Sequence, residues 1–200
     1  MTAMTAPEAV WGLVLAGGKS RRMGSDKALL KQDGETQLSR AVGLLAGHVE
    51  RVFVSTRSDQ DGDAERGRFE QVIDRYKDMG PVAGILSAMD ECPDVDWLVV
   101  ACDLPNIDAA TLDYLLNNRS QEQPFTAFRS SHDDLPEPLC AIYRAESHAV
   151  IREFVNSGLV CPRKILIRSD TLLLEQPDPR ALDNVNTPDD LAGSVLEARS

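Results

Sequence analysis

Two patterns of hydrophobic and polar positions alternate along the chain. Short runs of apolar residues are typical of buried strands, and longer segments with apolar residues every three or four positions are typical of amphipathic helices. The runs predict strands at residues 11–16, 51–56, 69–74, 96–105, 125–129, 138–144 and 172–175. Helices are predicted at residues 35–46, 80–92, 108–118, 145–155, 162–170 and 187–199. Residues 58–68 are polar and fit neither pattern, so we expect a mobile insert there.

This alternation of strands and helices predicts the fold class. Strands separated by helices form mostly parallel sheets that helices cover on both faces, which gives a three-layer α/β/α architecture. The run DWLVVACDLP at residues 96–105 is the most apolar and is expected to be a buried central strand. Ligands of such sheets bind at the carboxyl ends of the strands, so we expect the residues that bind ligands or catalyse a reaction to directly follow strands.

Length and charge limit the organisation and the partners. The 200 residues suit one domain that spans residues 1–200, with residues 1–9 as a disordered lead. The net charge is −11, from 21 basic and 32 acidic side chains, which disfavours general affinity for nucleic acid or an acidic membrane surface. No segment approaches the roughly 20 apolar residues of a membrane helix, and the start does not resemble a signal peptide.

The four cysteines are well separated and form no CxxC pair. This spacing argues against a zinc site or a disulfide framework. We therefore expect reduced, mostly buried thiols in a cytoplasmic protein.

The stretch LAGGKSRRMGSDKALL, which starts at Leu15, is the most unusual part of the sequence. Gly17 and Gly18 follow the first predicted strand and let backbone N–H groups approach a phosphate chain closely. Arg22 and Lys27 add positive charge that can neutralise phosphate oxygens. The spacing matches neither GxxxxGK[ST] nor GxGxxG. The alternative is a surface turn before a solvated, basic helix start.

Asp103 and two asparagines are further candidates. Asp103 follows VVAC at the end of the central strand, where a carboxylate can hold Mg²⁺ together with waters and substrate phosphates. The alternative is a helix cap. Asn184 and Asn186 flank Val185, so both would point to one side of an extended segment. The alternative for the asparagines is a turn ahead of a capped helix.

Four motifs, in order, carry a resemblance to a known family. LAGGKSRRMGSDK, GPVAGILSAM, VVACDLP and DNVNTPDDL resemble the signatures of the MobA-type nucleotidyltransferases, and the molybdenum cofactor guanylyltransferases are the most similar group. The resemblance covers nearly the whole chain and implies a Rossmann-like fold of the nucleotide-diphospho-sugar transferase type. It also implies transfer of GMP from GTP to the terminal phosphate of the molybdopterin cofactor, with Mg²⁺ as cofactor and pyrophosphate as the second product.

The resemblance assigns roles to single residues. Arg22, Lys27 and Asp103 would be catalytic, with Asp103 as the metal ligand, and Asn184 and Asn186 would contact the second substrate. The positions implied to bind the nucleotide are Leu15, Ala16, Gly17, Gly18, Lys27, Ser55, Asp74, Gly80 and Asp103. Ser55 departs from the family, whose members carry Asn there. Contact with the pterin substrate and a solvated helix face both remain open for Arg163, Lys164 and Arg168.

Other functions remain open at this point. In this superfamily LAGG tends to accompany guanylyl transfer and LAAG cytidylyl transfer, so Gly17 and Gly18 favour GTP over CTP. Relatives that activate sugar or polyol phosphates are further alternatives. A non-catalytic module that delivers the cofactor to a molybdoenzyme is another, although Lys27 and Asp103 argue against it. Proteins that carry molybdopterin, and molybdoenzymes, are the expected protein partners.

Overall fold

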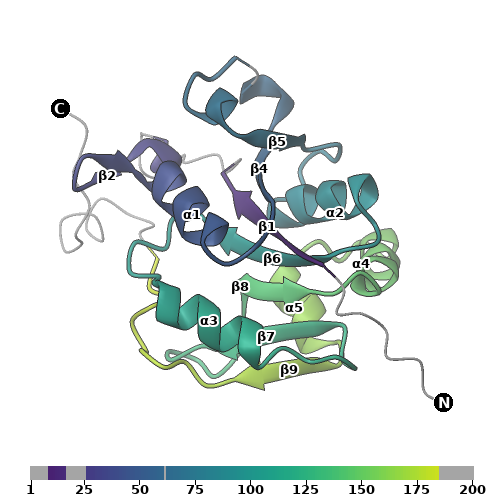
Figure 1. Ribbon diagram of the computed structural model, residues 1–200. Helices are drawn as coiled ribbons and strands as arrows, with labels where there is room; N and C mark the ends of the chain where they lie inside the picture. Colours follow the sequence, from purple (N-terminus) through teal and green to yellow (C-terminus); the bar gives the residue numbers. More distant parts are fainter. Residues whose placement is uncertain (1–8, 17–25, 61, 185–200) are drawn as a thin grey trace.

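A seven-stranded sheet forms the centre of the computed structural model, which describes residues 9–16, 26–60 and 62–184 (Figure 1). The strand order is β5-β4-β1-β6-β8-β7-β9. All neighbours are parallel except β8, which is antiparallel to both β6 and β7. The strands are β1 (Val10–Leu15), β4 (Val52–Thr56), β5 (Glu70–Ile73), β6 (Asp96–Ala101), β7 (Phe125–Arg129), β8 (Pro136–Tyr143) and β9 (Thr171–Leu174).

Helices cover both faces of this sheet (Figure 1). Successive residues of β6 face opposite sides of the sheet: Val100 packs in one hydrophobic cluster and Val99 in the other. The first cluster takes side chains from α1 and α3, and the second from α2, α4 and α5. The helices are α1 (Gln37–Ala46), α2 (Pro81–Glu91), α3 (Ala109–Asn117), α4 (Ser147–Asn156) and α5 (Pro162–Ile167). The predicted three-layer, mostly parallel α/β/α fold is confirmed.

The reversal of strand order identifies the edge where a ligand is expected. After β1 the chain adds β4 and β5 on one side, and it then returns to place β6 on the other side of β1. In open α/β sheets, ligands bind at the carboxyl ends of the strands where the order reverses in this way. Ala16 and Cys102 directly follow β1 and β6, so the glycine-rich sequence and Asp103 begin at this edge.

Strand β6 ends at Ala101 rather than at residue 105, and three further differences from the predicted elements concern a hairpin, strand β8 and the insert. A small hairpin, β2 (Lys31–Gln32) and β3 (Glu35–Thr36), precedes α1 and was not predicted. Strand β8 begins at Pro136 rather than at residue 138, and its antiparallel direction follows from the short loop after β7, since a parallel strand needs a long crossover.

The insert at residues 58–68 is the third difference. It contains two 3-10 helices, η2 (Ser58–Gln60) and η3 (Arg66–Arg68), and the Arg66 side chain is buried. The second half of the insert therefore packs against the rest of the protein, and its mobility stays a prediction.

Two expectations concern the chain ends and the membrane. The helix predicted at residues 187–199 lies outside the described residues. Of the N-terminal segment 1–9, which was expected to be disordered, only residue 9 is described. Within the described ranges, no helix is long and apolar enough to cross a membrane.

Candidate functional site

The candidate site lies along the carboxyl ends of β1, β4, β5 and β6. Hydrogen bonds continue the sheet past the strand ends here: Ala16 N donates to Ser55 O at 3.3 Å, and Cys102 N donates to Leu15 O at 3.3 Å. Asp74 follows β5, and its backbone N donates to Thr56 O at 2.8 Å. The side chains that follow four different strands are thereby fixed at one edge.

Lys27 and Asp103 form an ion pair at this edge. Lys27 Nζ lies 3.2 Å from Asp103 Oδ2, although the two residues are 76 positions apart in the sequence. Their side chains are 17% and 20% exposed, so the pair remains accessible to a ligand. The sequence motifs that carry these residues therefore meet in space, as predicted.

Asp26 fixes the backbone that carries Lys27. Lys27 is the first residue of the 3-10 helix η1 (Lys27–Leu29), and Asp26 is the N-cap. Asp26 Oδ1 accepts a hydrogen bond from Ala28 N at 3.1 Å. Because an N-cap satisfies the open donors of the first turn, Asp26 fixes the direction in which the Lys27 side chain leaves the chain.

Ser55 and Asp74 form a second polar group on the β4 and β5 side of the site. Ser55 is 2% exposed, and its Oγ donates to Asp74 Oδ1 at 2.7 Å. Burial raises the pKa of Asp74, while the Ser55 hydrogen bond and the Arg57 charge oppose the rise. The buried Ser55 hydroxyl thus orients the Asp74 carboxylate.

Gly84 lets helix α2 approach this group closely. A Cβ atom at Gly84 would lie 2.2 Å from Ser55 Oγ, closer than real Cβ atoms approach, and a tight 3.1 Å from Leu15 Cδ2. Helix α2 begins after Gly80, which has a φ of 55°, a conformation that favours glycine. Both glycines therefore bring the N-terminal half of α2 against the candidate nucleotide site.

The segment 175–184 reaches the same edge from the end of β9. Ser131 Oγ donates to Pro179 O at 2.8 Å, and His132 Nε2 lies 2.9 Å from Asp183 Oδ1. The Asp183 hydrogen bond and charge raise the pKa of His132. These contacts hold the chain just before Asn184, the last described residue and a predicted contact of the second substrate.

One cation of α5, Arg163, has partners within the protein. Arg163 pairs with Asp133 at 2.9 Å and with Glu137 at 3.0 Å. These ion pairs join α5 to the loop after β7 and to β8.

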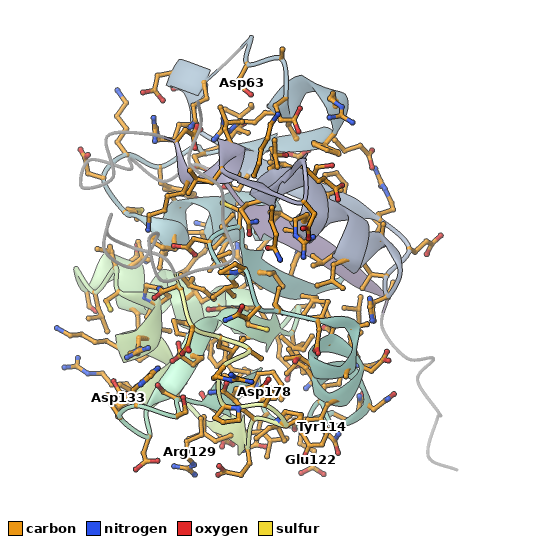
Figure 2. All side chains as sticks on the ribbon, turned by 90° about the vertical axis from the view of Figure 1, so that its left-hand side faces the viewer. Asp63, Tyr114, Glu122, Arg129, Asp133 and Asp178 are labelled. Carbon is orange, nitrogen blue, oxygen red and sulfur yellow. The ribbon has the colours of Figure 1, made fainter. Side chains whose placement is uncertain are left out.

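Figure 2 shows Asp133 and Asp178 at one end of the molecule and Asp63 of the insert at the other.

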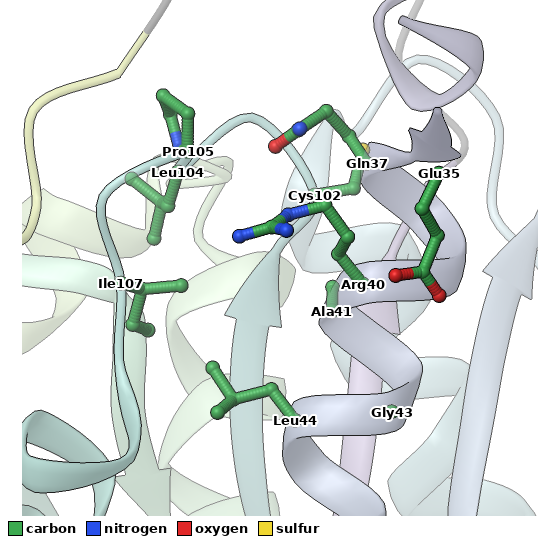
Figure 3. A pocket seen from close by; sticks show the side chains of 10 residues that line it. All are labelled: Glu35, Gln37, Arg40, Ala41, Gly43, Leu44, Cys102, Leu104, Pro105 and Ile107. Carbon is green, nitrogen blue, oxygen red and sulfur yellow. The ribbon is translucent and has the colours of Figure 1, made fainter. Parts of the chain in front are cut away.

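A cleft of about 280 Å³ opens beside the site, between α1 and the segment after β6 (Figure 3). Its lining residues include Arg40, Leu44, Cys102 and Ile107. Burial raises the pKa of the Cys102 thiol far above its usual range, so the thiol stays neutral and is a poor nucleophile. All four cysteines are free; Cys102 and Cys140 are buried and the other two are partly buried, as predicted.

The site holds one carboxylate that could bind a metal on its own. Among the described residues, no group of three or more His, Cys, Asp and Glu side chains is placed to hold a metal ion. Asp103 alone still fits Mg²⁺, which prefers oxygen ligands and commonly binds through one or two carboxylates together with waters and substrate phosphates.

Comparison with known proteins gives the family. Residues 12–172 match the family model of the MobA-like NTP transferase domain. The chain belongs to this family. It is 31% identical to a probable molybdenum cofactor guanylyltransferase of Trichormus variabilis over 90% of this chain and 87% of that protein. It is 36% identical to a molybdenum cofactor biosynthesis bifunctional protein of Synechocystis over 90% of this chain and 52% of that protein, so it spans about half of that relative.

A solved structure of a protein with 21% identity shares the fold. A structure of molybdopterin-guanine dinucleotide biosynthesis protein A from Archaeoglobus fulgidus superimposes with a TM-score of 0.75. It covers 92% of this chain and 95% of that one, at 21% identity. The predicted nucleotidyltransferase fold and the MobA-type resemblance are therefore confirmed.

The structure brings most of the predicted site residues together. Those at the edge are Leu15, Ala16, Lys27, Ser55, Asp74, Gly80 and Asp103. Four predicted residues, Gly17, Gly18, Arg22 and Asn186, lie outside the described residues. For all the predicted site residues, the contribution to binding and catalysis stays a prediction.

Sequence reasoning missed Asp26 and Arg66. Asp26 stands directly before Lys27 in the signature, and its position before a predicted helix start was an available signal for a cap. Arg66 lies in a polar stretch, and no signal in the sequence marked it as buried.

Proposed function

We propose that the protein transfers the GMP moiety of GTP to the terminal phosphate of the molybdopterin cofactor and releases pyrophosphate. The observation that carries this proposal is the Lys27–Asp103 pair at the carboxyl edge of a MobA-like NTP transferase fold. The pair brings a cation and a carboxylate that could hold Mg²⁺ to the edge where the strand order reverses. The similarity to proteins named molybdenum cofactor guanylyltransferase supports the choice of substrates.

The reaction forms one bond and breaks another at the α-phosphorus of GTP. An oxygen of the cofactor phosphate attacks the α-phosphorus, and the bond from that phosphorus to the α–β bridging oxygen breaks. The bonding electron pair leaves with pyrophosphate. Because the attacking oxygen is already an anion, the step needs no general base. Catalysis then depends on alignment and on stabilising the charge that develops on the leaving group.

The residues of the site divide these tasks. The Lys27 ammonium stabilises negative charge on the triphosphate as pyrophosphate leaves. Asp103 would hold Mg²⁺, which when bound neutralises phosphate charge and orients the phosphate oxygens. Asp74, which Ser55 orients, would accept hydrogen bonds from the nucleotide. Asn184, with Asn186, would contact the cofactor phosphate.

The proposed reaction also indicates the protein partners. A guanine dinucleotide cofactor has to reach an enzyme that uses it, so proteins that carry molybdopterin and molybdoenzymes are the partners we propose. The free cysteines are consistent with the reducing cytoplasm, where we propose that the protein acts.

Thermal unfolding with different nucleotides tests the choice of GTP. With Mg²⁺ present, GTP should raise the melting temperature more than CTP, ATP or UTP, because only a ligand that binds the folded state stabilises it. A hundredfold excess over Kd adds about 2.7 kcal/mol, which corresponds to several degrees for a chain of this size. Mg²⁺ without nucleotide gives the baseline. Preferential stabilisation by CTP would instead identify a cytidylyltransferase.

A further inference from the structure

Arg66 is the least exposed charged side chain among the described residues. It comes from the polar insert, yet only 1% of it is exposed. A buried guanidinium is costly to desolvate unless good partners surround it. Its partners therefore indicate what the residue does.

The partners of Arg66 bracket the glycine-rich loop. One terminal nitrogen, NH2, donates to Ala16 O at 2.8 Å and to Asp26 Oδ2 at 2.8 Å. The other terminal nitrogen, NH1, lies 3.4 Å from Asp63 Oδ2. Ala16 is the residue directly before the segment 17–25, and Asp26 is the residue directly after it. A single guanidinium thus ties the two ends of the loop together.

The contact between Arg66 and Asp26 also affects the neighbouring Lys27–Asp103 pair. Asp26 uses Oδ2 for Arg66 and Oδ1 for the backbone N–H of Ala28, so its carboxylate is held from two sides. Lys27 lies between Asp26 and Ala28 in the sequence, and its Nζ lies 3.2 Å from Asp103 Oδ2. A change at Arg66 would therefore shift the start of η1, and with it the Lys27 ammonium.

The insert that carries Arg66 is itself fixed. Asp63 Oδ1 accepts a hydrogen bond from Arg66 N at 2.9 Å, and Asp63 O accepts one from Gly67 N at 2.9 Å. Glu65 Oε1 accepts a hydrogen bond from Thr36 Oγ1, the N-cap of α1, at 2.7 Å. This hydrogen bond lowers the pKa of Glu65, which keeps its carboxylate ionised. The segment that carries the guanidinium is thus held by several hydrogen bonds.

We infer that Arg66 is a positioning residue for the transfer reaction. By joining Ala16 to Asp26 it closes the ends of the phosphate-binding loop and aims Lys27 at the triphosphate. Its contacts are with Ala16, Asp26 and Asp63, so it acts through Asp26 and Lys27 rather than on the substrate itself. The inference rests on the proposed function, but binding of Mg²⁺–GTP alone can test it.

Arg66→Met tests the inference with a side chain of similar length that lacks hydrogen bonds. Removing one partner of a buried ion pair usually destabilises a protein because the other charge is left without a partner, but Asp26 and Asp63 keep side chains that are 30% and 27% exposed to water. We therefore expect the variant to fold with a lowered melting temperature, and its kinetics are measured well below that temperature. Its kcat should fall about 10- to 100-fold, because a misplacement of about 1 Å can cost that much. Affinity for Mg²⁺–GTP should fall by a smaller factor.

Two further variants separate positioning from a general structural role. Arg66→Lys should recover only part of the lost rate, because one ammonium cannot reproduce the planar donor geometry at both partners. In the double variant Arg66→Met with Asp26→Asn, kcat should be little lower than in either single variant, since both changes break the same link. Additive losses would mean that Arg66 does not act through Asp26.

Arg144→Met is the matched control. Arg144 is also buried and paired, with Glu146, but it follows β8 at the opposite edge of the sheet, where Tyr143 pairs with Trp97. Its kcat and GTP affinity should stay within twofold of wild type. If folded Arg66→Met also binds Mg²⁺–GTP and turns over like wild type, the inference is wrong. If wild type binds GTP but makes no dinucleotide, the proposed function fails, and the binding data still decide the role of Arg66.

Discussion

Lys27→Ala is expected to lower turnover by roughly 10²–10³-fold, the usual scale for removing one preorganised electrostatic contact to a transition state. Negative charge on the leaving pyrophosphate grows as the α–β bridge breaks, so the ammonium stabilises the transition state more than bound GTP. The loss should therefore appear mainly in kcat, with a smaller change in affinity for GTP. Single-turnover kinetics with saturating Mg²⁺–GTP measure it.

The controls for Lys27 use a second lysine and a conservative change. Lys31→Ala removes an exposed ammonium from the neighbouring hairpin and should leave the rate unchanged. Lys27→Arg should recover only part of the rate, because a planar fork does not replace a compact point charge. Near-wild-type rates in folded Lys27→Ala would mean that Lys27 is only a partner of Asp103.

Asp103→Asn is expected to abolish measurable turnover while the fold is retained. The amide keeps the size of the side chain but removes the charge that would hold Mg²⁺, and it weakens the link to Lys27. Because the pair is partly exposed, the change in the free energy of unfolding should stay below about 1 kcal/mol. Turnover measured as a function of Mg²⁺ concentration, beside urea unfolding, separates the two effects.

Asp108→Asn is the matched control for Asp103. Asp108 caps α3 through the backbone N–H of Thr111 at 2.8 Å, and asparagine caps helices equally well. Its activity and Mg²⁺ dependence should match those of wild type. Wild-type turnover of Asp103→Asn at limiting Mg²⁺ would remove Asp103 from the metal site.

Periodicity predicted the sheet and its helices because those elements depend on local apolar patterns. The runs at residues 11–16 and 96–105 became the neighbouring strands β1 and β6, and this adjacency explains why two distant motifs meet. The direction of β8 follows from a short loop rather than from its own residues. The hairpin β2–β3 escaped prediction because strands of two residues leave no periodic pattern.

The site was predictable where a residue follows a strand and unpredictable where it acts from a distance. Asp74 and Asp103 come directly after apolar runs, so their common edge followed from the parallel sheet. Arg66 contacts residues 50 and 40 positions away, and no local pattern encodes such contacts. In the sequence, a buried arginine in a polar insert looks the same as a solvated one.

Product analysis tests the central claim most directly. The purified protein, Mg²⁺ and the molybdopterin cofactor are incubated with GTP or with CTP, and the products are identified by mass spectrometry while pyrophosphate is measured. The account predicts a cofactor that carries one added GMP, one pyrophosphate for each product formed, and little product with CTP or without the cofactor. A cofactor that gains CMP but no GMP, or GTP that is bound and never transferred, would contradict it.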